Sequence, residues 1–429
     1  MTVDILVLSN GPGELATWVR PVVQALREHL GCDRTSVRIS VILSPCPHAT
    51  GKEAKIAASY PEVDRVQAPE HFLPFLLSGK TAENWDWHEK GVVLFLGGDQ
   101  FCTVVIGKRL KYRTVIYAEW EARWYRWIDK FATMKQEIFD KIPPKYANKF
   151  TVVGDLIAEV GDRKLDRAGT DKLDRAGTGA PPLREIELIG LLPGSKPAKL
   201  ALGVPLCLSI AQSIHRIRPE TRFVIPVAPT IDLQTLARFA DPEQNPCLHL
   251  FANSAAELHL TESPFLQTTN GLQIELWTET PAYDLLSECS LCLTTVGANT
   301  AELGSLAVPM IVLIPMQQLD AMKAWDGLPG LLANLPLVGS VFATVINWLI
   351  WRLGKRKLYA WPNIWAQAEI VPELVGKLEP EVVAGLAIDY LSHPEKLAQM
   401  GDRLRGVRGE SGAAKKIAQL VFEELDLQQ

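Results

Sequence analysis

The sequence predicts an α/β protein of two doubly wound domains that face a cleft, and three observations lead to this prediction. Short apolar runs rich in β-branched residues recur along the chain, with helical patterns between them. These runs are apolar throughout, which is typical of parallel strands covered on both faces. A chain of 429 residues is also too long for one core and suits two domains of ~150–200 residues.

Composition and charge are those of an ordinary globular protein, with 47% hydrophobic residues and a net charge of −5. That charge argues against nucleic acid as a partner. The opening residues MTVDILVLSNGPGE lack the basic start of a signal peptide and are interpreted as a first strand. Seven scattered cysteines favour free thiols in a reducing cytoplasm. Cys289 and Cys292 form a CxxC without a second pair or a nearby His, so no metal site is expected.

The first domain, expected over residues 1–163, opens as a βαβ unit. Residues 15–31 carry apolar side chains at helical spacing, with Gly31 as a stop and Pro21 predicting a kink or a late start. The strands expected in this domain are 3–9, 37–43, 92–97, 114–118 and 150–155.

A polar linker is expected over residues 164–184, where the heptapeptide KLDRAGT occurs twice. A second domain follows over residues 185–379. Its expected strands are 186–194, 222–228, 272–278, 291–297 and 309–315. Residues 380–429 are helical in period, and these helices can pack back on the N-terminal domain.

Two loops of the first domain follow expected strands and carry carboxylates. In LSNGPGEL, Gly11 and Gly13 allow a tight turn, and Glu14 begins the next helix, where the dipole favours an acid. The alternative is a plain strand-to-helix turn. In LFLGGDQFC, two glycines expose Asp99, a candidate general base if burial raises its pKa. The alternative is that Asp99 caps the following helix.

The loop LLPGSKPAK of the second domain has the character of an anion site. A strand ends, Gly194 turns, and Ser195 and Lys196 precede a helical run. The N–H groups at a helix N-terminus together with an ammonium attract a phosphate. The full P-loop pattern is absent, but a nucleotide diphosphate fits this loop.

A second glycine turn, in TTVGANTAEL, offers further groups for a nucleotide. Gly297 and Asn299 lie at the expected turn, Thr300 is expected to cap, and Glu302 is expected in the first helical turn, where it can reach a ribose hydroxyl. A third stretch, WPNIWAQAEIVPEL, reads as a loop rich in hydrogen-bonding groups, with helix capping as the alternative. Its polar side chains are Asn363, Gln367, Glu369 and Glu373.

The motifs LLPGSK, GANTAELGSLAVPMIV and PNIWAQAEIVPEL, in this order, resemble those of lipid-A-disaccharide synthases. That family carries an LLPGSR loop, an SGTATLE helix start and a PNxxAxxxxVPE loop. Residues 117–131, YAEWEARWYRWIDKF, are similar to its Trp-rich segment. The resemblance covers most of the chain and is strongest from about residue 186 to 375. It implies a GT-B-like fold and an inverting glycosyltransferase that needs no metal or other cofactor.

The family joins a UDP-linked diacylglucosamine to a lipid-linked sugar acceptor, diacylglucosamine 1-phosphate, on the cytoplasmic membrane surface. The resemblance therefore implies a UDP-sugar donor as substrate and a peripheral location on the inner face of the cell membrane. Asp99 is the candidate base, with Glu14 as the second choice. The implied nucleotide-sugar-binding residues are Gly13, Gly194, Ser195, Lys196, Gly297, Asn299, Thr300, Glu302, Asn363, Glu369 and Glu373.

The departures from the family lie mainly in the first domain. The family loop GEASGD is NGPGELAT here and keeps only the Gly13–Glu14 pair, and IDAPDF becomes LGGDQF. In the second domain an arginine is replaced by Lys196, which loses bidentate phosphate geometry, and another by Ala368. The donor half is therefore better kept than the acceptor half, which leaves the acceptor open.

An apolar insertion, residues 327–357, is expected to lie in the membrane interface. No charged residue occurs from Gly327 to Trp351, a length that could span a bilayer. Prolines and glycines break the segment, so an interfacial position is favoured over a true span or a core helix. The residues expected to contact lipid are Trp348, Trp351, Arg352, Lys355, Arg356 and Lys357.

Two other functions remain open at this point. The altered acceptor loops are compatible with a catalytically silent, membrane-associated scaffold that retains the fold. A UDP-sugar epimerase has a similar two-domain fold but leaves the apolar insertion unexplained. The sequence does not indicate an oligomeric state.

Overall fold

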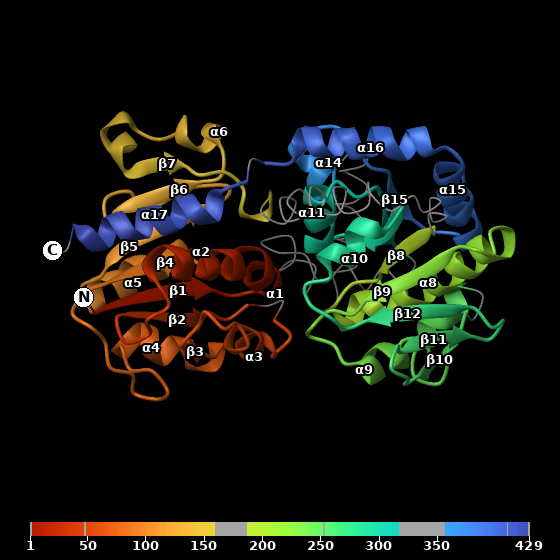
Figure 1. Cartoon of the computed structure of the whole chain (residues 1–429), viewed down its shortest axis with the longest axis horizontal. Coiled ribbons are helices and arrows are strands. Elements are labelled where there is room, and N and C mark those ends of the chain that lie inside the picture. Colours follow the sequence, from red (N-terminus) through yellow and green to blue (C-terminus); the bar gives the residue numbers. More distant parts are fainter. Residues whose placement is uncertain are drawn as a thin grey trace, which may run out of the picture. The chain divides into compact units, whose positions relative to one another are not determined.

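The computed structural model of the chain describes residues 2–46, 49–158, 187–251, 254–316, 357–409 and 411–427. It divides into two compact units, each with its own sheet (Figure 1). Unit 1 contains the described residues up to 158 and those from 408 onward, and unit 2 those from 187 to 407. The expected linker 164–184 and the insertion 327–357, apart from Lys357, lie outside the described residues.

The sheet of unit 1 is parallel throughout, in the order β3-β2-β1-β4-β5-β6-β7. The direction of winding reverses between β1 and β4, so this is a doubly wound sheet with its switch point there. Its strands are β1 (Val3–Ser9), β2 (Val37–Leu43), β3 (Arg65–Gln67), β4 (Gly91–Phe95), β5 (Arg113–Ala118), β6 (Lys130–Thr133) and β7 (Phe150–Val152).

Strand β1 shows why the apolar runs are continuous. Ile5 and Val7 point into one core, whereas Leu6 and Leu8 point into the core on the other face of the sheet. Helices cover both faces, so every position of the strand is buried. The helices of unit 1 are α1 (Pro12–Glu14), a π-helical turn (Leu15–Val19), α2 (Arg20–Leu30), α3 (Glu53–Ala58), α4 (Phe72–Ser78), α5 (Gln100–Leu110), α6 (Gln136–Phe139) and α17 (Ala413–Asp426).

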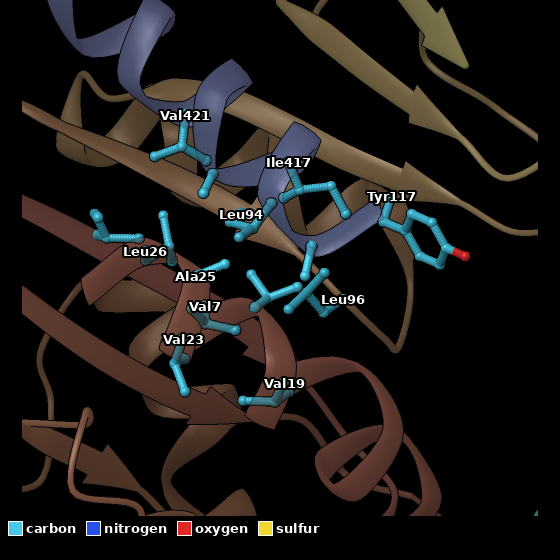
Figure 2. Packing of buried hydrophobic residues seen from close by; sticks show 14 of the residues in the cluster. Val7, Val19, Val23, Ala25, Leu26, Leu94, Leu96, Tyr117, Ile417 and Val421 are labelled. Carbon is cyan, nitrogen blue, oxygen red and sulfur yellow. The ribbon is translucent and has the colours of Figure 1, made fainter. Parts of the chain in front are cut away.

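The last helix, α17, belongs to unit 1 although its neighbours in sequence belong to unit 2. Its buried face joins the same core as α2 and the central strands. Figure 2 shows Ile417 and Val421 of α17 reaching down to Leu94 of β4, with Leu26 of α2 alongside. A buried carboxylate of the helix, Glu424, also pairs with Arg113 of β5 (Nε–Oε2 2.6 Å).

The sheet of unit 2 has eight strands in the order β10-β11-β12-β9-β8-β13-β14-β15. All neighbours are parallel except the β10–β11 and β11–β12 pairs. The winding reverses between β8 and β13, which is the switch point of this unit. Its strands are β8 (Leu188–Leu192), β9 (Arg222–Pro226), β10 (Ala256–His259), β11 (Phe265–Thr268), β12 (Gln273–Trp277), β13 (Leu291–Thr295), β14 (Met310–Pro315) and β15 (Glu373–Gly376).

The central helix of unit 2 is α8 (Pro197–Ile217), which packs on the sheet beside α15. Among the described helices α8 alone has the length and hydropathy of a membrane span, and most of its apolar stretch is buried within the unit. The other helices are α9 (Leu233–Arg238), α10 (Tyr283–Glu288), α11 (Ala298–Ser305), α14 (Trp361–Ala366), α15 (Pro380–Ser392) and α16 (Pro394–Val407).

The structure confirms the predicted fold class and all ten strands expected from apolar runs. The helix after β1 does not start late, because it runs without a break from α1 at Pro12 through a π-helical turn into α2; the irregularity expected at Pro21 is this π-helical turn, which ends just before it. Five strands were missed: β3, β6, β10, β11 and β15. The stretch WPNIWAQAEIVPEL is not simply a loop, since it begins with α14 and ends as β15.

Candidate functional site

The carboxyl ends of β8 and β13 bring together the two glycine turns singled out in the second domain. In open parallel sheets ligands bind at such switch points. Gly194 has φ +108° and Gly297 has φ +150°, backbone angles that side-chain-bearing residues rarely adopt. Helix α8 begins after the first turn and helix α11 after the second. The N-terminal backbone N–H groups of both helices therefore lie at these turns.

Lys199, which the sequence analysis did not select, connects these two turns. Its Cβ lies so close to Gly194 that a Cβ on that glycine would meet it at 2.9 Å. Its ammonium reaches the second turn, where it donates a hydrogen bond to the Val296 carbonyl and lies 3.2 Å from the place of a Cβ on Gly297. Burial, together with the nearby charge of Lys196, lowers the pKa of Lys199 to about 8.

The neighbouring residues of both turns lie as expected, with one difference. Ser195 and Lys196 are half-buried between β8 and α8, and Asn299 is half-buried in the first turn of α11. Thr300 is not the cap of α11, because Gly297 occupies that position. Its buried hydroxyl instead donates to the Gly297 carbonyl (2.9 Å) and accepts from Trp361 N (3.2 Å), so it ties the turn to α14.

Glu302 lies one turn deeper in α11 than expected. The first turn of that helix holds no acidic residue, and Glu302 is its fifth residue. Burial raises the pKa of Glu302 to about 7, and a hydrogen bond with Tyr283 of α10 opposes this rise. The residue is therefore half-protonated near neutral pH and can both donate and accept hydrogen bonds.

The polar groups of 361–374 mostly bind one another. The fully buried Asn363 accepts from Ile370 N (2.8 Å) and Val371 N (2.9 Å) and donates to Val371 O (2.9 Å) and Glu373 Oε1 (2.8 Å). The Glu373 carboxylate also accepts from Ala360 N (2.7 Å) just before α14. Asn363 and Glu373 thus hold residues 360–373 together, whereas Glu369 is exposed.

The switch point of unit 1 holds a second set of polar side chains. Three of them surround Gly97 at the end of β4: a Cβ there would lie 2.9 Å from Asn10 Oδ1, 3.3 Å from Ser9 Oγ and 3.5 Å from Glu14 Cγ. The Ser9 hydroxyl is buried without a hydrogen-bond partner among the described residues. Glu14 closes α1 and folds back over Gly11, so its carboxylate lies beside the glycine turn that follows β1. Gly13 contributes its carbonyl to the Thr17 hydroxyl (2.9 Å).

Asp99 is exposed and caps α5, where its carboxylate accepts a hydrogen bond from Phe101 N (2.9 Å). The capping role, named above as the alternative, is therefore present. The burial on which the role of general base was argued is absent.

Glu119, at the end of β5, is a carboxyl group that the sequence analysis quoted without selecting. Burial first, and then the charges of Asp155 and Glu14, raise the pKa of Glu119 to about 8. It therefore retains its proton at neutral pH beside a second carboxylate. In the sequence, Glu119 is marked only by its position directly after an apolar strand. Many acidic residues on protein surfaces occupy the same kind of position, so this pattern does not single it out as a site residue.

The remaining site predictions concern metal and lipid. Across the described residues, no group of three or more His, Cys, Asp and Glu side chains is arranged to hold a metal ion. Five of the six residues expected to contact lipid lie outside the described part of the chain, namely Trp348, Trp351, Arg352, Lys355 and Arg356. The sixth, Lys357, places its ammonium over the ring of Tyr359 (5.5 Å).

Known proteins resemble this chain in fold, and the sequence identity to the curated relatives is low. No family model matches the chain. It is 23% identical over 244 residues to a lipid-A-disaccharide synthase of Persephonella marina, covering 56% of this chain and 51% of that protein. For the lipid-A-disaccharide synthase of Geobacter sulfurreducens the identity is 22% over 317 residues, covering 71% and 64%. The chain thus spans about half to two thirds of the length of these curated relatives.

Among solved structures, a Listeria monocytogenes protein assigned as a UDP-N-acetylglucosamine 2-epimerase has a TM-score of 0.50 at 12% identity, covering 97% of this chain and 95% of its own. A UDP-GlcNAc 2-epimerase of Neisseria meningitidis, crystallised with UDP-GlcNAc, has a TM-score of 0.49 at 14% identity over the whole of both chains. At 12% identity the likeness to the Listeria protein concerns the fold alone, a GT-B-like fold of two Rossmann-like domains.

Proposed function

We propose that this chain is an inverting glycosyltransferase that transfers a UDP-linked, acylated glucosamine-type sugar to a lipid-linked sugar acceptor. The observation that carries the proposal is the pair of glycine turns at the β8–β13 switch point, with the Lys199 ammonium between them. The likeness to lipid-A-disaccharide synthases supports the choice of reaction. A site of two helix N-termini and a cation suits a diphosphate.

The same groups account for departure of the nucleotide. As the bond between C1 of the sugar and the β-phosphate oxygen breaks, negative charge develops on UDP. Backbone N–H groups at the start of α8 and α11 and the ammonium groups of Lys196 and Lys199 stabilise that charge. The proposal therefore requires no cofactor.

The acceptor hydroxyl must lose a proton as its oxygen attacks C1 from the opposite face. We assign this step to Glu14, whose carboxylate lies at the unit 1 switch point near Ser9 and Asn10. Asp99, the first candidate from the sequence, becomes the second candidate here because it is exposed and caps α5; it follows the same strand end as Gly97. General base catalysis of this kind contributes roughly 10²–10⁴-fold to rate.

We further propose that the protein works on the inner face of the cell membrane, because acylated substrates leave a bilayer at a cost of ~0.8 kcal/mol per CH₂. The apolar composition of 327–351 and the basic residues that follow it support this location. In the described part of unit 1, Phe101, Trp120 and Trp127 are exposed aromatic side chains of the kind that favour lipid headgroups.

The test combines a titration and a product analysis. Purified protein is titrated with UDP, and then incubated with UDP-N-acetylglucosamine or its diacylated form and native lipid extract, with products identified by mass spectrometry. We expect UDP binding and a glycosylated lipid. A protein without affinity for UDP would instead be the scaffold, and conversion of the donor to its 2-epimer without transfer would indicate an epimerase.

Two variants assign the proton acceptor. Glu14→Gln should lower transfer by roughly 10²–10⁴-fold with little change in UDP affinity. Asp99→Ser keeps a helix-capping oxygen and should leave transfer within a few fold of the parent protein. If Asp99→Ser instead loses transfer and Glu14→Gln keeps it, the base is Asp99.

A further inference from the structure

Within the nucleotide site of the proposed function, Lys199 is the residue that links the two glycine turns. It lies in the first turn of α8, and its side chain passes from the Gly194 turn to the Gly297 turn across the switch point. Within the described part of the chain, the Val296 carbonyl is its one hydrogen-bond acceptor. An ammonium has three N–H donors, so two remain for another partner at this place.

The charge around Lys199 is not balanced by the neighbouring loops. The charged group that acts on it is Lys196, a like charge on the preceding loop, and the effect is to lower the pKa of Lys199. The facing turn, residues 296–299, contributes Val, Gly, Ala and Asn, none of which titrates. The nearest acid of α11 in sequence is Glu302, which itself is partly protonated near neutral pH. A partly buried cation in such surroundings gains stability from an anion.

We propose that Lys199 is a phosphate-binding residue of the nucleotide site and makes the affinity of that site for diphosphates depend on pH. The inference rests on the proposed function, because it takes a nucleoside diphosphate as the ligand. It differs from the sequence-based expectation, in which Lys196 provides the charge. Lys199 contacts both turns, whereas Lys196 is the N-cap of α8 at the end of the first turn.

The direction of the pH dependence follows from proton linkage. Below pH 8 the free protein carries the Lys199 ammonium, and the affinity for UDP is constant as far as this group is concerned. A bound diphosphate raises the pKa of Lys199, so above pH 8 binding requires uptake of one proton. The affinity should then fall about tenfold per pH unit until the pKa of the complex is reached.

The experiment is calorimetric titration of the whole protein with UDP from pH 7 to pH 9.5, with uridine as the phosphate-free control. Lys199→Met should bind UDP roughly 10- to 100-fold more weakly at pH 7, lose the decrease above pH 8 and bind uridine as the parent does. Lys196→Met is the matched control. It should keep the decrease, shifted to higher pH because the repelling charge is gone.

A second variant, Lys199→Arg, keeps a cation that does not titrate in this range. It should retain UDP binding without the decrease above pH 8, and it keeps the test decisive if Lys199→Met does not fold. Unchanged UDP affinity and pH dependence in Lys199→Met would overturn the inference. So would an equal loss of uridine and UDP affinity, since a residue that only holds the loops together affects both. Absence of UDP binding by the parent protein at every pH would instead contradict the proposed function.

Discussion

At the scale of single residues, the Lys199 side chain starts at the N-terminus of α8 and its ammonium reaches the Gly297 turn. Lys196 and Lys199 are three residues apart, and the motif LLPGSK draws attention to the first. Which lysine turns inward depends on how α8 packs beside β8, where Gly203 lies directly against the Pro193 carbonyl. No sequence pattern predicts the contact between Gly203 and the Pro193 carbonyl, so the sequence alone does not indicate Lys199 as a site residue.

The same limit applies to the segment around Asn363. The sequence shows that the segment is rich in polar residues, but a sequence pattern is the same whether such groups bind a ligand or one another. In the structure all four hydrogen bonds of the Asn363 amide stay within the chain. Asp99 is a similar case, since an acid before a helix serves equally well as a cap or as a base.

Glu119 supplies a prediction at this scale. Its pKa of about 8 in the folded protein lies above the 4.5 of an ordinary glutamate, so the unfolded chain releases this proton first as the pH rises. The stability contributed by the protonated form is complete below pH 4.5 and is lost as the pH rises through 8. Glu119→Gln should therefore match the parent near pH 4.5 and be more stable at pH 8.5, by on the order of 2–4 kcal/mol.

Urea unfolding at several pH values measures this difference. The matched control is Glu121→Gln, two residues along, where the side chain is 64% exposed and pairs with Arg123. That control should change stability by less than ~1 kcal/mol at every pH. Equal pH dependence in the parent protein and in Glu119→Gln would show that Glu119 is not held protonated.

At the scale of elements, the predictable strands are those with continuous apolar runs. Most of the ten strands predicted from apolar runs are buried along nearly their whole length, such as β1 and β13, whereas β7 and β12 have fewer buried positions. The missed ones are short, lie toward the sheet edges or are only partly buried. Strand β15 has just four residues and no fully buried position, and β6, also of four residues, begins at the end of the Trp-rich segment 117–131.

The turn after β8 can be tested as an element. Gly194→Ala places a Cβ at φ +108° and 2.9 Å from the Lys199 Cβ, so the turn must shift. We expect a loss of ~1–3 kcal/mol in unfolding free energy and a weaker affinity for UDP, because the first turn of α8 moves. Gly385→Ala in α15 is the control, since a Cβ there meets no atom within 4 Å. It should be neutral or slightly stabilising by ~0.5–1 kcal/mol. An unaltered UDP affinity in Gly194→Ala would separate the turn from the binding site.

At the scale of the whole molecule, length and alternation predict two doubly wound domains, and the structure contains them. Periodicity also predicts helices over 380–424, but it cannot assign each helix to a sheet. The structure places α15 and α16 in unit 2 and α17 in unit 1. The distinction depends on side-chain packing: the apolar face of α17 fits α2 and the central strands, and Glu424 finds Arg113.

Because α17 completes the core of unit 1, a cavity made in it should weaken that unit in particular. Ile417 is fully buried among residues of the central strands and α2, so Ile417→Ala should cost ~2–4 kcal/mol. Hydrogen exchange followed by mass spectrometry can locate the effect, since amides of β1, β4 and β5 should lose protection while those of β8 and β13 keep theirs. Gln419→Ala, on the exposed side of the same helix, should leave both sets unchanged. If the amides of β8 and β13 lost protection instead, α17 would stabilise unit 2. The helix would then have to be assigned to the core of unit 2.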